Sequence, residues 1–286
     1  MSTYRIYVDS RDRQSGTAED FTYALPYTVN ITEKSLANID AVVIPNSIQT
    51  VIPGKNDLIY FRENSQLDQS YQKIARLNPG YYNIESLATE IARAMTEVSF
   101  MPGVGPNPGY AVNYNSRLGR YEFGNPAQRF GFFFLIYSKE TQEIGAANNI
   151  STVPRIIENG NGAWRLLGLM TGPDILVVGD GDEIPGVAPN APMLQYATQL
   201  FIKTSLGISG RSVGAKGNMS ISRRVILEAP QFALNVDRHA TSWDSFQISA
   251  GTLISTFTVT LTDYNNNVID LNGQDWSFSI TIFRED

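Results

Sequence analysis

Three carboxylates stand close together in the segment Gly179–Glu183. Asp180, Asp182 and Glu183 offer the oxygen ligands that Ca²⁺ prefers, and a pair of such groups is also what a carbohydrate-active enzyme uses to cleave a glycosidic bond. Their spacing does not match an EF-hand loop, and spacing along the chain does not determine the separation on which a glycosidase depends. We therefore favour a solvated acidic loop and keep the three residues only as candidate metal ligands.

The single histidine, His239, is the second place where residue types suggest chemistry. Ser242 and Asp244 follow it closely, and together these three types make a catalytic triad. The Gly-x-Ser-x-Gly turn that presents a hydrolase serine is missing from the sequence. Because triad residues meet in the fold rather than in the sequence, we favour a histidine in a polar loop.

A glycine-rich segment from Gly207 to Gly217 carries Arg211 and Lys216. Backbone N–H groups of such a loop can hold an anion. The glycine spacing matches neither the dinucleotide-binding fingerprint nor the P-loop. The segment therefore indicates a surface loop rather than a phosphate site.

Three cations, Arg5, Arg11 and Arg13, lie near the start of the chain, with Asp9 and Asp12 among them. The carboxylates largely neutralise the arginines, and exposed ion pairs contribute under about 1 kcal/mol each. We expect local ion pairing here and not a basic patch.

The composition narrows the function classes. The chain has 286 residues, with 22 Lys and Arg against 28 Asp and Glu, a net charge of −6. Nucleic-acid binding depends on cations that displace counterions from phosphates, so we expect no specific nucleic-acid partner. The absence of cysteine excludes disulfides, cysteine-ligated metals and thiol nucleophiles. We expect no cofactor and no enzymatic activity.

The most apolar segment contains Phe130, Phe132, Phe133 and Phe134. It is too short to cross a bilayer, and the opening residues lack the apolar stretch of a signal peptide, so we expect no transmembrane segment. Two interpretations stay open for the phenylalanines. We favour a core strand; the alternative is a patch that is buried against another subunit.

Alternating apolar and polar residues at both ends of the chain predict antiparallel strands. The pattern is clearest in 257–262 and 276–282, with the tight-turn pair Asn272-Gly273 between them. A strand through Phe21 is expected to stop at Pro26, because proline cannot donate to a ladder. Residues 110–114 and 120–123 predict a hairpin.

One segment predicts a helix. After Asn83, which can cap it, apolar residues from Ile84 to Val98 recur at helical spacing on one face. The whole pattern indicates a mainly β fold, an antiparallel sandwich with Greek-key or jelly-roll wiring, one amphipathic helix and an inserted middle region. We expect the sandwich to comprise residues 1–99 and 196–286. The loop-rich residues 100–195 are then the insertion, either as loops or as a small second domain.

A family resemblance rests on three parts of the chain. They are 4–13 followed by 20–25, then 44–48 followed by 78–88, and finally 257–263 followed by 270–278. In this order they resemble single jelly-roll minor capsid and penton proteins of large double-stranded DNA viruses, virophages and polinton-like viruses.

The resemblance implies a virion structural protein without catalytic residues. Such chains form pentamers at fivefold vertices or cement major capsid capsomers. It implies a homo-oligomer, with a pentamer favoured, other capsid proteins as partners, and a place in the virion after assembly in the host cell.

Two other functions stay open on the residues alone. The first is a receptor- or glycan-binding β module of the fibre-head type, in which exposed Tyr81, Tyr82, Trp164 and Trp243 would stack on sugars. The second is a carbohydrate-active enzyme that uses the carboxylates of 180–183. We rank both after the structural role.

Overall fold

The computed structural model divides the chain into two compact units. Unit 1 combines Met1–Ile48 with Ala197–Asp286, and unit 2 is the continuous segment Gln49–Tyr196. The residues that the structure describes are 4–63, 72–101, 105–106, 109–124, 132–135, 162–169, 175–178, 186–207, 213–214, 217–218, 221–238 and 245–284.

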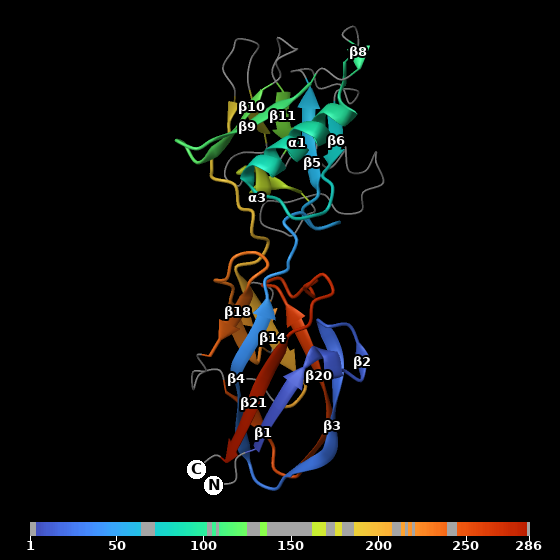
Figure 1. Ribbon diagram of the computed structural model, residues 1–286, viewed down its shortest axis with the longest axis vertical. Helices are drawn as coiled ribbons and strands as arrows, with labels where there is room; N and C mark the ends of the chain where they lie inside the picture. The colour runs from blue at the N-terminus through green and yellow to red at the C-terminus, as the bar shows by residue number, and fades with distance from the viewer. Residues whose placement is uncertain are drawn as a thin grey trace. The chain divides into compact units, whose positions relative to one another are not determined.

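Unit 1 is built from β-strands and one short 3-10 turn, η1 (Ser10–Asp12). In chain order the strands are β1 (Tyr4–Asp9), β2 (Ser15–Gly16), β3 (Asp20–Ile31), β4 (Ser35–Pro45), β14 (Gln199–Thr204), β15 (Val213–Gly214), β16 (Gly217–Asn218), β17 (Arg223–Ile226), β18 (Leu234–Asp237), β19 (Phe246–Ile248), β20 (Thr252–Thr262) and β21 (Ser277–Arg284). Figure 1 shows the strands from both ends of the chain side by side.

The strand order of unit 1 is that of a jelly roll. The first sheet runs β1-β21-β4-β18, with β19 also paired to β4, and the second runs β17-β14-β20-β3-β2. All pairings described in unit 1 are antiparallel: β1 with β21, β2 with β3, β3 with β20, β4 with β18, β19 and β21, β14 with β17 and β20, and β15 with β16. The early strands thus pair with the late strands in reverse order, as in a ribbon folded onto itself. The predicted antiparallel, mainly β fold is confirmed.

The alternation read from the sequence matches the burial in the strands. Phe257, Val259 and Leu261 of β20 are buried, while Thr258 is exposed. β21 buries Phe278, Ile280 and Ile282 in the same way. Strands of this kind place one face on the core and the other toward solvent, so each sheet covers one side of a shared apolar interior.

Pro26 does not end its strand. β3 continues to Ile31, but its register against β20 shifts between Ile254 and Thr256, so residues 25–28 oppose Ser255 alone. The irregularity explains how proline is tolerated, because a residue that lies outside the ladder needs no N–H donor. The expected strand end was therefore wrong.

In the part of unit 2 that the structure describes, short strands combine with two helices, α1 (Ile84–Val98) and α3 (Trp164–Leu167). Its strands are β5 (Leu58–Glu63), β6 (Gln72–Arg76), β7 (Phe100–Met101), β8 (Gly105–Pro106), β9 (Ala111–Asn115), β10 (Arg120–Gly124), β11 (Phe132–Leu135), β12 (Ile175–Val178) and β13 (Gly186–Val187). Two sheets carry the order β12-β11-β5-β6 and β13-β10-β9. The predicted hairpin is β9–β10.

The predicted helix is α1, and it begins as expected. The side chain of Asn83 accepts a hydrogen bond from the Ser86 backbone N–H at 2.7 Å, and the Ser86 hydroxyl accepts one from the Asn83 N–H, so a capping box is complete. The buried stripe of the helix comprises Leu87, Ala88, Ile91, Ala94 and Met95. None of the helices among the described residues is long and apolar enough to cross a membrane.

The boundaries of the two units differ from those that we expected from the sequence. We expected 1–99 in the sandwich, whereas the first part of unit 1 ends at Ile48 and residues 49–99 belong to unit 2. The reason is the apolar stripe of α1, which packs against β6 and β9 and not against a jelly-roll sheet. The whole of unit 2 is thus inserted between β4 and β14.

Candidate functional site

The turn after β1 is held by an aspartate at its start. The Asp9 carboxylate accepts hydrogen bonds from the Arg11 backbone N–H at 3.0 Å and from the Arg11 guanidinium at 3.0 and 2.6 Å. The hydrogen bonds from Arg11 hold the pKa of Asp9 below its usual value. Arg11 itself is mostly exposed. The pair therefore shapes η1 and does not create a free cationic site.

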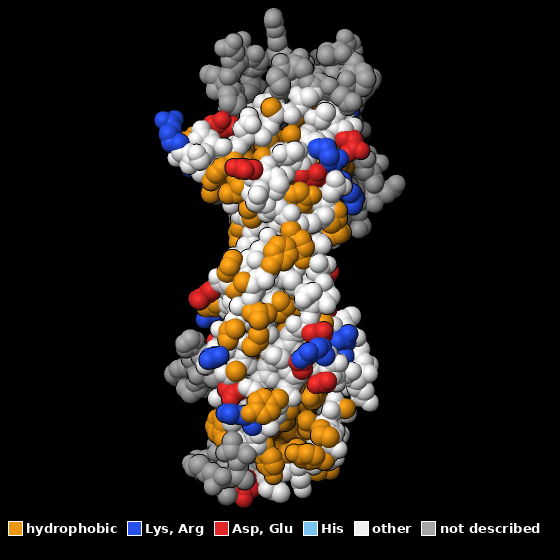
Figure 2. Space-filling view, viewed as in Figure 1, with side chains coloured by type: hydrophobic (Ala, Val, Ile, Leu, Met, Phe, Trp, Pro, Cys, Tyr) orange, Lys and Arg blue, Asp and Glu red, His pale blue; other side chains and the backbone are white. Residues whose placement is uncertain are grey.

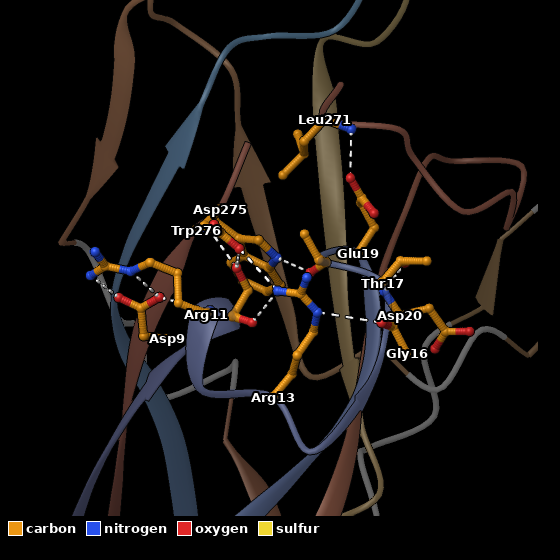
Figure 3. A network of polar contacts seen from close by, with 12 residues as sticks. Asp9, Arg11, Arg13, Gly16, Thr17, Glu19, Asp20, Leu271, Asp275 and Trp276 are labelled. Carbon is orange, nitrogen blue, oxygen red and sulfur yellow. Dashed lines mark hydrogen bonds and ion pairs between the residues drawn. The ribbon is translucent and has the colours of Figure 1, made fainter. Parts of the chain in front are cut away.

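The same turn is bound to the loop before the last strand (Figure 3). The Arg13 guanidinium donates to the Ser10 carbonyl at 2.7 Å and to Asp275 Oδ1 at 3.2 Å. The Ser10 hydroxyl donates to Asp275 at 2.7 Å and accepts from the Trp276 N–H at 3.0 Å. Ser10 is buried, and its bond from the Trp276 N–H is shielded from water, whereas the Arg13–Asp275 bond is exposed.

Glu19 and Trp276 extend this network into the core. The Glu19 carboxylate accepts a hydrogen bond from the Leu271 N–H at 2.9 Å, and the Trp276 indole donates to the Ala18 carbonyl at 2.7 Å. The Trp276 ring stacks on Phe278 with centroids 5.0 Å apart. We call residues 9–20 and 271–276 together the clasp, because they join the beginning of unit 1 to its end.

A second polar cluster crosses the first sheet. Asp40 is the extra residue of a β-bulge in β4, and its carboxylate accepts hydrogen bonds from Ser279, from Thr281 at 2.7 Å and from Arg5 at 3.1 Å. Burial raises the pKa of Asp40, but the two hydroxyls and the Arg5 charge outweigh it and hold the pKa below its usual value. The bulge thus aims one carboxylate at two neighbouring strands.

The three N-terminal arginines are paired, but not all with the expected partners. Arg11 pairs with Asp9, as the sequence suggested, whereas Arg5 pairs with Asp40 and Arg13 with Asp275. The last two carboxylates are far away in the sequence and no local pattern indicates them. No basic patch forms from these cations.

Side chains also bridge the two sheets at both edges of the sandwich. At one edge the Tyr23 hydroxyl of β3 donates to the Tyr7 carbonyl of β1 at 3.1 Å. At the other, the buried Arg223 of β17 pairs with Asp237 of β18 at 2.9 Å, and the Asn235 amide donates to the Ile226 carbonyl at 2.9 Å. β1 therefore lies beside β3, and β17 beside β18.

Several sequence candidates lie outside the described residues. These are Asp180, Asp182, Glu183, His239, Ser242, Trp243, Asp244, Arg211, Lys216 and Phe130. Gly214 and Gly217 of the glycine-rich segment face each other in the β15–β16 pair. Within the described part of the chain, no three acidic or histidine side chains are close enough to hold a metal ion.

The phenylalanine segment forms an interior strand of unit 2. β11, which contains Phe132, Phe133 and Phe134, lies between β12 and β5. The Phe134 side chain is fully buried, and its ring meets that of Phe123 edge to face with centroids 4.9 Å apart. For Phe134 the structure thus shows the core position that we favoured over a subunit patch.

Trp164 is not the exposed sugar platform that we considered. It is only 6% exposed and packs against the Tyr60 ring with centroids 5.9 Å apart. Tyr81 and Tyr82 are partly buried, and the Tyr82 hydroxyl donates to the Asn78 carbonyl at 3.0 Å. A helical turn that places one apolar face inward explains the burial of Trp164, which the sequence pattern did not show.

The clasp contains residues that sequence reasoning had not selected as a site. Glu19 was overlooked because its partner Leu271 is 252 positions away. The available signal was the resemblance itself, since its first and third segments include 9–13, 20 and 270–276. These two segments meet in the clasp.

Comparison with solved structures found 21 similar chains, among them the two that follow. No protein-family model matches the sequence, and neither does any curated protein. The chain is similar to the mavirus penton protein, with a TM-score of 0.46 and 9% identity over 99% of both chains. It is also similar to a chain in the structure of the Sputnik virophage, with a TM-score of 0.45 and 11% identity over 99% of this chain and 97% of that one.

Proposed function

We propose that the chain is a structural subunit of a virus shell, either the penton or a minor capsid protein. The observation that carries the proposal is the wiring of unit 1, a jelly roll with unit 2 inserted between β4 and β14. Jelly rolls are the building blocks of many capsids. The order of the three sequence segments adds independent support.

The geometry of the clasp agrees with a mechanical role. Its hydrogen bonds join residues that are 265, 262 and 252 positions apart in the sequence, and the Arg13 guanidinium pairs with the Asp275 carboxylate. A shell subunit must keep its shape while it is held by neighbours, and buried satisfied networks give such rigidity. The proposal includes no catalytic step, no cofactor and no nucleic-acid contact.

The partners follow from this role. We propose a homo-oligomer, with a pentamer favoured, that contacts other capsid proteins in the virion. Rings of identical subunits use many modest contacts, which symmetry multiplies. The low charge of the chain, with 17% charged residues, suits such contacts because little charge must be desolvated.

Purified virus particles provide the test. We expect quantitative mass spectrometry of gradient-purified particles to find this chain at a fixed ratio to the major capsid protein, and a reconstruction to place unit 1 in the shell. A non-structural protein from the same infected cells is the matched control for carry-over. A chain that stays in the soluble fraction with that control overturns the proposal.

A further inference from the structure

One edge of the unit 1 sandwich exposes apolar side chains. We call it the β17–β18 edge; its exposed apolar residues are Ile226, Phe232, Leu234 and Val236. In β18 the usual alternation is reversed, because Leu234 and Val236 face solvent while Asn235 is buried and bridges the sheets. Apolar groups presented together in this way mark a contact surface.

Phe232 is held there at a cost. It has a φ of 67° in the turn from Pro230 to Ala233, whose Ala233 N–H donates to the Pro230 carbonyl at 3.0 Å. This left-handed conformation normally belongs to glycine or asparagine. The Phe232 backbone N–H donates to the Asn46 carbonyl at 2.8 Å, while the side chain is bulky and 68% exposed. Strain of this kind is characteristic of functional positions.

The opposite edge exposes tyrosines. We call it the β1–β3 edge; Tyr7 and Tyr27 are 70% and 71% exposed, and Tyr4 is also exposed. Tyrosine combines a large rigid ring with a polar group and is enriched in protein interfaces. Figure 1 shows β18 on one side of unit 1 and β3 on the other, and Figure 2 shows apolar side chains gathered over the part that carries β1 and the end of β3.

The charges of the two edges are complementary. Arg224 of β17 and Arg238, directly after β18, are exposed cations, and the exposed Glu228 offsets only one of them. Asp12 and Asp20 at the β1–β3 edge are exposed anions, whereas the arginines nearby are already paired. Arginine is attracted both to carboxylates and to the faces of tyrosine rings.

We propose that the β17–β18 edge of one copy of this chain binds the β1–β3 edge of a second copy. The two edges belong to the same sandwich but to opposite sides of it, and they differ in chemistry. A contact between unlike surfaces is heterologous, and repeated contacts of this kind close into a ring when the rotation permits. The inference rests on the proposed shell role and names the surfaces through which subunits of the shell meet.

Two edge variants test it in the full-length chain. Phe232→Asn with Leu234→Ser disables the β17–β18 edge, and asparagine tolerates the left-handed backbone. Tyr7→Ser with Tyr27→Ser disables the β1–β3 edge and leaves the Tyr7 carbonyl in place for Tyr23. Val268→Ser is the matched control. It removes an exposed apolar side chain from the turn after β20, which belongs to neither edge.

Sedimentation velocity over a range of concentrations gives the readout. We expect the wild type and the control to form oligomers, and each edge variant alone to associate at least about tenfold more weakly, the size of effect expected from losing hot-spot residues. A mixture of the two edge variants retains one intact edge of each kind and is expected to form dimers of one copy of each, and nothing larger.

Other outcomes contradict the proposal. Three results would each contradict the proposed contact between the two edges. They are oligomers that persist in either edge variant, a mixture that stays monomeric while the wild type assembles, and a wild type that never associates. Circular dichroism and the melting temperature show that the variants are folded. The shell role fails separately, by absence of the chain from purified particles.

Discussion

The two units differ in the interactions that stabilise each of them internally. Unit 1 is made of two chain segments, and its polar ties join residues as far apart as Ser10 and Asp275, 265 positions along the chain. Unit 2 is one segment, and the side-chain hydrogen bonds described within it join residues that are closer in the sequence: the Glu90 carboxylate accepts from the Asn78 N–H, 12 positions away, and the Tyr121 hydroxyl donates to the Ile84 carbonyl, 37 positions away. Unit 1 therefore needs both of its segments, whereas unit 2 is formed by one continuous segment.

The aromatic contacts in the cores of the two units also differ. The largest fully buried side chains of unit 2 are aromatic, and the rings of Tyr121, Phe123 and Phe134 meet edge to face in succession. In unit 1 the aromatic contact around Trp276 lies in the clasp, where the two segments join. A single substitution should thus affect the stability of one unit and not the other: a substitution in the clasp should destabilise unit 1 alone.

Trp276→Ala is expected to have the largest effect. It removes a buried ring, its stacking on Phe278 and its hydrogen bond to Ala18, and loss of a buried large aromatic residue costs about 3–5 kcal/mol. Hydrogen–deuterium exchange, resolved by peptide, should show faster exchange in 4–45 and 199–284 and no change in unit 2. Phe123→Ala is the matched control, with the reverse result. Equal acceleration in both units would contradict the separation.

Glu19→Ala is expected to have a smaller effect, again only in unit 1. The substitution leaves the Leu271 N–H buried without its acceptor, which costs about 1–3 kcal/mol in the free energy of unfolding. Glu19→Gln keeps an acceptor oxygen and should lose much less. Chemical denaturation of the three proteins, followed by fluorescence and exchange, measures the difference. A glutamine variant as unstable as the alanine variant would show that charge, not the hydrogen bond, matters.

Acid should lower the unfolding free energy of both units. Of the substitutions considered, Asp40→Asn should make the smallest difference between the two units. The pKa values of Asp9 and Asp40 in unit 1 lie below their usual values. The same holds for Glu90 in unit 2: burial raises its pKa, but the hydrogen bonds from Arg93 and the Asn78 N–H outweigh that effect. A carboxyl whose pKa is lower in the folded state contributes stability above its unfolded pKa and loses it as the pH falls through the folded value.

Asp40→Asn removes one of these contributions from unit 1. We therefore expect a shallower loss of stability of unit 1 with acid, by about 1 kcal/mol or less, and an unchanged slope for unit 2. Unfolding free energies at a series of pH values below neutral, with exchange to assign each unit, measure this. An unchanged slope in unit 1 would mean that Asp9 and the remaining carboxylates account for its acid sensitivity.

Local patterns in the sequence predicted much of the fold. The alternation in 257–262 and 276–282 identified β20 and β21, and the spacing after Asn83 identified α1 and its cap. These predictions succeeded because a strand or a helix turn places neighbouring residues on defined faces, whatever lies opposite. The fold class followed from the same patterns and the turn residues between them.

The candidate site was predictable only in part. The motif at 9–13 drew attention through its arginines, but their true partners Asp40 and Asp275 come from strands and loops that the pattern cannot align. Trp164 looked available for a ligand, yet the packing of α3 buries it. Whether a side chain is exposed depends on which surface meets its element, and that is a property of the whole fold.

The sequence by itself determined which segments become strands, where the helix begins, and that both chain ends carry half-buried sheet. Only the tertiary structure decided that α1 belongs to the inserted unit, that β3 continues past Pro26, and that residues 9–20 close on 271–276. The physical reason is the range of the interactions. Backbone geometry and capping act over a few residues, whereas register, burial and ion pairing depend on partners that the folded chain brings from hundreds of residues away.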